Sequence, residues 1–179
     1  MTGGLPSEVM TTSGKAMTFL NMARKYQKAG TRLLESIEGD KADPQCALSD
    51  PMYFLFAHTL ELAFKAFLLF RGEAIPMSGK AGHDIVTLHR QCAALGLHLK
   101  EDVDSLPRVV EMLATENEHH GFRYFDPVKG NNGIIPALPW TCAVVNALIA
   151  VIREQLGDTT PDGPLKVQFI VGNPTTKDS

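Results

Sequence analysis

The chain has 179 residues, of which 44% are hydrophobic and 21% charged, and its formal net charge is -3. A chain of this length can bury the core of one domain. The acidic balance excludes the broad basic surface that binding to duplex DNA requires, but it permits a small basic pocket. Cys46, Cys92 and Cys142 lie far apart, which indicates reduced thiols. No signal peptide is predicted, so we expect a cytoplasmic protein.

Residues 1–13 are rich in glycine, serine and threonine and are expected to be disordered. From Ala16 to Ile37, apolar side chains recur at helical spacing, and lysine and arginine fill much of the remainder. This pattern predicts a long amphipathic helix with one face in water, which ends at Gly39 and Asp40.

The second predicted helix, from Pro51 to Phe70, is the most apolar part of the chain. Asp50 is suited to be its N-cap, and proline fits the first helical turn. A helix that is apolar on nearly every side belongs at the centre of a bundle. Its few polar residues argue against a membrane span.

Three of those polar residues, His58, Glu61 and Lys65, lie at positions i, i+3 and i+7 and therefore share one stripe. Glu61 and Lys65 are also spaced for an ion pair one turn apart. Two interpretations are open. The stripe is either a seam that faces solvent and is stabilised by the pair, or the wall of a cleft.

Three further helices are predicted. The third follows a glycine-containing loop over residues 73–84 and ends at Gly96, with its apolar positions at Ile85, Leu88, Cys92 and Leu95. The fourth begins between Ser105 and Pro107 and ends at Gly121, with Val109, Val110, Leu113 and Asn117 facing inward. The fifth follows a long loop and runs from Pro139 to Gly157.

Apolar and polar side chains alternate after the last helix, from Lys166 to Val171. This pattern predicts a strand-like or extended tail within residues 158–179, and a lone strand needs a partner for its backbone. A second subunit is the economical partner, and a tail lying across the bundle is the alternative. The expected fold class is all-α: an up-and-down bundle of about five helices over residues 14–157, followed by the tail.

Three motifs in this order resemble the HEPN superfamily of nucleotide-binding domains: LELAFKAFLLFRG, GHDIVTLHRQCAALG and TENEHHGFRYFDP. The resemblance covers roughly Ala16 to Leu156. Residues that match the family's short motifs are Glu61, Lys65, Gly82, His83, Arg123 and Tyr124. The resemblance implies a helical bundle that dimerises and binds or cleaves RNA or nucleotides, often as a toxin in a paired system.

The chain departs from the family's ribonuclease motif, in which four to six residues separate an arginine from a histidine. Arg123 has no histidine downstream, and the spacing from Arg108 to His119 is too long. We therefore expect a binding or regulatory module without catalysis and without a cofactor, with a cognate protein partner or a second copy of itself. The expected ligand-binding residues are Lys65, His83, Arg123 and Tyr124, supported by Glu61, Glu116 and Asn117.

The stretch ENEHHGFRYFD leaves three other interpretations open. A divergent ribonuclease would use His119 or His120 with Arg123. A metal-binding bundle would hold one zinc or iron ion with ligands from His58, Glu116, His119 and His120, because Glu-x-x-His is a ligand spacing of di-iron bundles. In a purely structural, partner-binding dimer, the two adjacent histidines would only end the fourth helix before Gly121.

Overall fold

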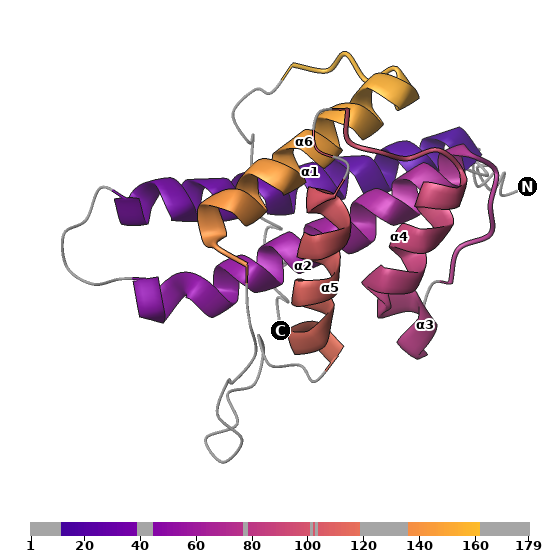
Figure 1. The fold of residues 1–179 in the computed structure, drawn as a ribbon. Helices are drawn as coiled ribbons and strands as arrows, with labels where there is room; N and C mark the ends of the chain where they lie inside the picture. Colours follow the sequence, from indigo (N-terminus) through magenta and orange to yellow (C-terminus); the bar gives the residue numbers. More distant parts are fainter. Residues whose placement is uncertain are drawn as a thin grey trace, which may run out of the picture.

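The computed structural model describes residues 12–38, 45–76, 79–100, 102, 104–118 and 136–161. These residues form six helices and no strand, which confirms the all-α prediction for this part of the chain (Figure 1). The helices are α1 (Thr12–Glu38), α2 (Gln45–Phe70), α3 (Gly79–His83), α4 (Ile85–Ala94), α5 (Ser105–Glu118) and α6 (Leu138–Leu156). The predicted strand-like segment and the histidine-rich stretch after α5 lie outside the described residues.

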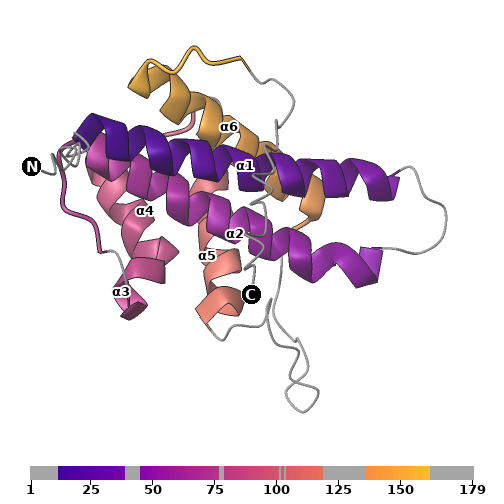
Figure 2. The same cartoon turned by 180° about the vertical axis from the view of Figure 1, so that it is seen from behind.

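Two long helices, α1 and α2, run side by side in opposite directions and form the largest contact between any two elements (Figures 1 and 2). Helix α6 lies against both of them. Helices α4 and α5 form an antiparallel pair that packs on α2, away from α1. Helix α2 is therefore enclosed by α1, α4, α5 and α6.

The enclosure of α2 explains its composition. Every residue from Thr59 to Leu68 is buried, so this stretch of the helix has no face in water. Phe56, Phe64 and Phe67 are among the largest fully buried side chains. By length and composition, Asp50–Phe70 would also be long and apolar enough to cross a membrane, but 72% of that window is buried inside the protein, as in the core helix of a globular domain.

The predicted start of α2 is wrong. The helix begins at Gln45, so Pro51 lies inside it and Asp50 is not its N-cap. A proline inside a helix removes one backbone hydrogen bond and crowds the preceding turn. Pro51 is exposed, and the apolar face that follows it is packed on α1, so tertiary burial outweighs the local preference.

A short helix, α3, replaces part of the loop predicted over residues 73–84. Gly82 and His83 are the last two residues of this helix. Asp84 is the N-cap of α4: its carboxylate accepts hydrogen bonds from the backbone N–H groups of Val86 at 3.1 Å and Thr87 at 3.0 Å. The cap fixes the turn from which the His83 side chain projects.

The later helices follow the prediction closely. Helix α6 has a proline in its first turn and ends at Gly157, whose φ of 67° is the left-handed conformation typical of a helix C-terminus. Val109, Val110 and Leu113 of α5 are buried, as expected. The same holds for Ile85, Leu88 and Cys92 of α4.

The chain after α6 is held against α1 by a buried carboxylate. Asp158 accepts hydrogen bonds from Arg24 Nη1 at 3.0 Å and Arg153 Nε at 3.1 Å, and its side chain is only 1% exposed. Arg24 is itself buried. This contact joins α1 to the segment that follows α6.

Candidate functional site

Glu61, in the middle of α2, is the centre of a cluster of charged and titratable side chains. Lys65 Nζ lies 2.8 Å from Glu61 Oε1, and His83 Nδ1 lies 3.1 Å from Oε2. His58 Nδ1 is 3.7 Å from the same Oε2, an ion-pair distance that is too long for a hydrogen bond. Sequence analysis placed Glu61 and three of its companions in candidate sites, and the structure brings these four together.

Local structure explains how the cluster assembles. His58, Glu61 and Lys65 lie one turn apart along α2, where residues at i, i+3 and i+4 are neighbours. His83 comes from another element, the last position of α3, and reaches the carboxylate because the cap at Asp84 turns the chain there. Two segments separated by more than a dozen residues thus meet at one carboxylate.

The stripe on α2 does not face solvent, so that interpretation is wrong. Counted over all its atoms, Glu61 is 4% exposed, and Lys65 is 3% exposed. The helices packed around α2 cover this face, and the ion pair lies in the interior. Burying such a pair costs desolvation energy, which the direct contact between the two charges offsets.

Glu61 is ionised at neutral pH. Burial by itself raises the pKa of this carboxyl, but the imidazoles of His58 and His83 and the ammonium group of Lys65 outweigh that effect and lower the pKa to about 2. Glu61 therefore acts as a fixed hydrogen-bond acceptor under physiological conditions.

The imidazole of His58 is packed between aromatic rings. It meets Tyr26 of α1 edge to face with ring centroids 4.5 Å apart, and it stacks parallel to Phe54 at 5.9 Å. Its Nδ1 is buried and has no hydrogen-bond partner within the described part of the chain. His58 is thus held mainly by ring packing, on the side of Glu61 that faces α1.

His83 is the most exposed member of the cluster. Its side chain is 56% exposed, whereas those of Glu61 and Lys65 are 6% and 4% exposed. A molecule approaching this part of the protein would meet the imidazole of His83 before either buried charge.

Several candidate residues lie outside the part of the chain that the structure describes. His119, His120, Arg123 and Tyr124 lie outside the described residues, as do the side chains of Glu116 and Asn117. Their proximity to Lys65 and His83 stays a prediction. Among the residues that the structure does describe, no group of three or more histidine, cysteine, aspartate or glutamate side chains is arranged to hold a metal ion.

Cys92 and Cys142 are buried free thiols. Cys92 Sγ donates to the backbone carbonyl of Phe64 at 3.6 Å, and burial raises the pKa of its thiol to about 12. A thiol in this state is not a nucleophile at neutral pH. Cys142 contacts Thr31 Oγ1 at 3.4 Å in the interface between α1 and α6.

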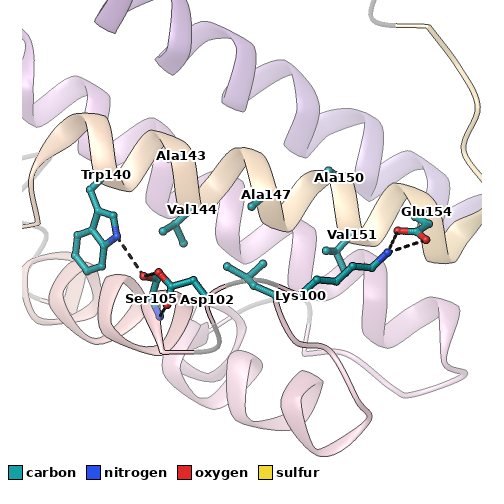
Figure 3. A pocket seen from close by; sticks show the side chains of 11 residues that line it. Lys100, Asp102, Ser105, Trp140, Ala143, Val144, Ala147, Ala150, Val151 and Glu154 are labelled. Carbon is teal, nitrogen blue, oxygen red and sulfur yellow. Dashed lines mark hydrogen bonds and ion pairs between the residues drawn. The ribbon is translucent and has the colours of Figure 1, made fainter.

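A hollow that was not predicted from the sequence runs along α6 (Figure 3). It has a volume of about 380 Å³, and its walls are largely apolar. One end carries the exposed ion pair Lys100–Glu154, and at the other Trp140 Nε1 donates to Ser105 Oγ at 3.3 Å (Figure 3). The feature of the sequence that could have indicated this hollow is the spacing of three alanines in α6, Ala143, Ala147 and Ala150. All three are exposed in the structure.

Comparison of the chain with protein-family models, with curated proteins and with solved structures finds no match.

Proposed function

We propose that this chain is an HEPN-like helical module that binds a nucleotide or the end of an RNA beside the exposed imidazole of His83. One observation carries the proposal: an ionised carboxylate buried at the centre of the protein, Glu61, is linked to the surface through one exposed imidazole. Buried ion pairs are costly to form, and strongly shifted pKa values are concentrated at functional sites.

Because Lys65 is buried, it has a different role in the proposed site from His83, Arg123 and Tyr124. Lys65 neutralises Glu61 from the interior and supports the site without touching the ligand. His83 is the contact group, held in place by the carboxylate. In this proposal Arg123 supplies the cation for a phosphate and Tyr124 a ring on which a base can stack, with Glu116 and Asn117 in supporting positions.

The proposed activity is binding or regulation, because the sequence lacks the Arg-x4–6-His motif of the family's ribonucleases. The proposal includes a homodimer in which the tail after residue 163 contributes to the contact between subunits. The alternation of apolar and polar side chains in that tail supports it, since an isolated strand needs a backbone partner.

Titration of the full chain with mononucleotides and short RNA at physiological salt tests the proposal. We expect saturable binding that His83→Ala and Arg123→Ala each weaken by about tenfold, a typical effect of losing one charged or well-placed hydrogen bond. His98→Ala is the matched control, because His98 is also exposed but lies beyond the opposite end of α4. An absence of binding, or binding unaltered by Arg123→Ala, would contradict the proposal.

A further inference from the structure

We infer that the hollow along α6 binds a small organic cation, in which an ammonium group carries a compact apolar body. The walls of the hollow are the outer face of α6 and residues that lead into the start of α5 (Figure 3). None of its lining residues belongs to the cluster around Glu61. The inference is therefore independent of the proposed function.

Two cross-links close the ends of the hollow and limit the size of its occupant. At one end Lys100 Nζ contacts both carboxylate oxygens of Glu154, at 3.0 and 2.7 Å. At the other end Trp140 Nε1 donates to Ser105 Oγ at 3.3 Å. Trp140 and Glu154 lie roughly 21 Å apart along the helix axis. A longer helix laid along α6 would collide with these cross-links, whereas a volume of about 380 Å³ suits a small molecule.

The α6 side of the hollow favours an apolar body. It consists of short aliphatic side chains, those of Ala143, Val144, Ala147, Ala150 and Val151. These side chains neither donate nor accept hydrogen bonds. The three alanines are exposed, and a bound apolar group would remove their surface from water, which is favourable.

The end of the hollow at Trp140 carries the polar recognition group. Ser105 Oγ donates to Asp102 Oδ2, and Asp102 Oδ1 accepts from the backbone N–H of Ser105 at 3.2 Å. Because Trp140 donates to the same hydroxyl oxygen, the indole and the carboxylate lie close together. A carboxylate can accept about four hydrogen bonds, so the exposed Asp102 can accept further ones. The face of an indole also attracts cations, so this end favours an ammonium group.

The charges of the lining also favour a cation over an anion. Lys100 is the only cation among the described lining residues, and Glu154 neutralises it. Asp102 has no ion-pair partner within the part of the chain that the structure describes. A bound ammonium group would balance this carboxylate, whereas an anionic head group would be repelled by it.

The experiment uses three probes that share one apolar body and differ in the head group: phenylbutylamine, phenylbutanol and phenylbutyrate. Trp140 is the only tryptophan of the sequence, so intrinsic tryptophan fluorescence of the full chain reports on this hollow. At neutral pH we expect the cationic amine to change the fluorescence saturably and to bind about tenfold more tightly than the neutral alcohol. The anionic butyrate should bind more weakly than the alcohol.

Three variants locate the site and the charge. Asp102→Asn should weaken binding of phenylbutylamine about tenfold and leave binding of phenylbutanol unchanged. Glu73→Gln is the matched control, because it removes an exposed carboxylate that does not line the hollow, and it should bind the amine normally. Ala147→Phe fills the hollow from an exposed position of α6 and should abolish binding of both probes without changing the circular dichroism of the helices.

Equal affinity for phenylbutylamine and phenylbutyrate, or amine binding unaltered by Asp102→Asn, would overturn the inference. A fluorescence that responds to none of the three probes would also overturn it. The same holds for a signal that changes with protein concentration alone and is lost in Ala147→Phe, because a second copy would then occupy the hollow. Each of these outcomes leaves nucleotide binding beside His83 untouched, since that proposal uses other residues.

Discussion

Lys65 Nζ and Glu61 Oε1 lie 2.8 Å apart, one turn from each other on α2, and both side chains are buried. The pair connects the interior of the bundle to His83, the exposed end of the cluster. Its burial distinguishes it from the pair Lys100–Glu154, whose side chains are 69% and 64% exposed.

Removing one member of the buried pair should destabilise the protein strongly. Lys65→Met leaves the charge of Glu61 in the interior without its cation, and we expect the free energy of unfolding to fall by about 3–5 kcal/mol. Lys100→Met, the matched exposed change, should cost less than about 1 kcal/mol. Urea unfolding monitored by circular dichroism measures both, and equal small losses would show that the pair is not buried in solution.

The low pKa of Glu61 predicts how stability depends on pH. Its pKa is lowered from 4.5 to about 2 in the folded protein. Ionised Glu61 therefore stabilises the fold above pH 4.5, and this contribution is lost as the pH falls from there towards 2. The loss is on the order of 3 kcal/mol.

Unfolding measured from neutral pH to acid should show this loss in the unmodified protein. Glu61→Gln, which cannot titrate at this position, should lose about 3 kcal/mol less over the same range. Parallel stability curves for the two proteins would contradict the assignment of an ionised, buried Glu61.

Gly30 permits the close contact between α1 and α2. A Cβ atom at this position would lie 2.7 Å from Cε1 of Phe56, whose side chain is fully buried. We expect Gly30→Ala to destabilise the protein by about 1–3 kcal/mol, although alanine favours a helix more than glycine does. The double variant Gly30→Ala/Phe56→Leu should be less destabilised than the sum of the single changes, and strict additivity in thermal or urea unfolding would refute the contact.

The carboxylate of Asp158 should stabilise the junction between α1 and the chain that follows α6. Asp158→Asn removes a buried negative charge that contacts two arginines, Arg24 and Arg153. We expect a loss of about 2–4 kcal/mol in the free energy of unfolding. Glu154→Gln is the control, because its carboxylate is exposed and its loss should change stability by less than about 1 kcal/mol.

The proposed homodimer depends on the tail beyond Gly163. Deletion of residues 164–179 should convert a dimer into a monomer without altering the helical content, because the described helices end at Leu156. Light scattering coupled to gel filtration gives the mass of each form. A monomeric full chain, or a dimer that survives the deletion, would contradict the role assigned to the tail.

Helix positions and ends were predictable wherever local signals agree with packing. Pro139 and Gly157 flank an apolar pattern of ordinary length, and α6 has these limits. The prediction from Pro51 was wrong for a physical reason: the start signal is local, whereas burial against α1 acts on the whole of α2. The short α3 has too few residues for any apolar period to appear in the sequence.

The site was predictable only in part, because burial depends on distant segments. The spacing of Glu61 and Lys65 predicts that they form an ion pair, but it does not predict whether water reaches the pair. The burial of the pair depends on how the other helices pack around α2, and the sequence of α2 alone does not specify that packing. The contact between Arg24 and Asp158 was missed for the same reason, since the two partners are 134 positions apart in the sequence.

The central claim is that the ionised carboxylate of Glu61 holds the ring hydrogen of His83 on Nδ1, so that the exposed imidazole of His83 is free to contact a nucleotide ligand. Nitrogen NMR of the histidine rings tests it directly, before and after a short RNA is added to the full chain. The account predicts a protonated Nδ1 and a bare Nε2 at His83, and an Nε2 signal that shifts with RNA while the signals of His98 stay unchanged. A hydrogen on Nε2 of His83 in the free protein, or a His83 signal that does not change when the RNA is added, would contradict the claim.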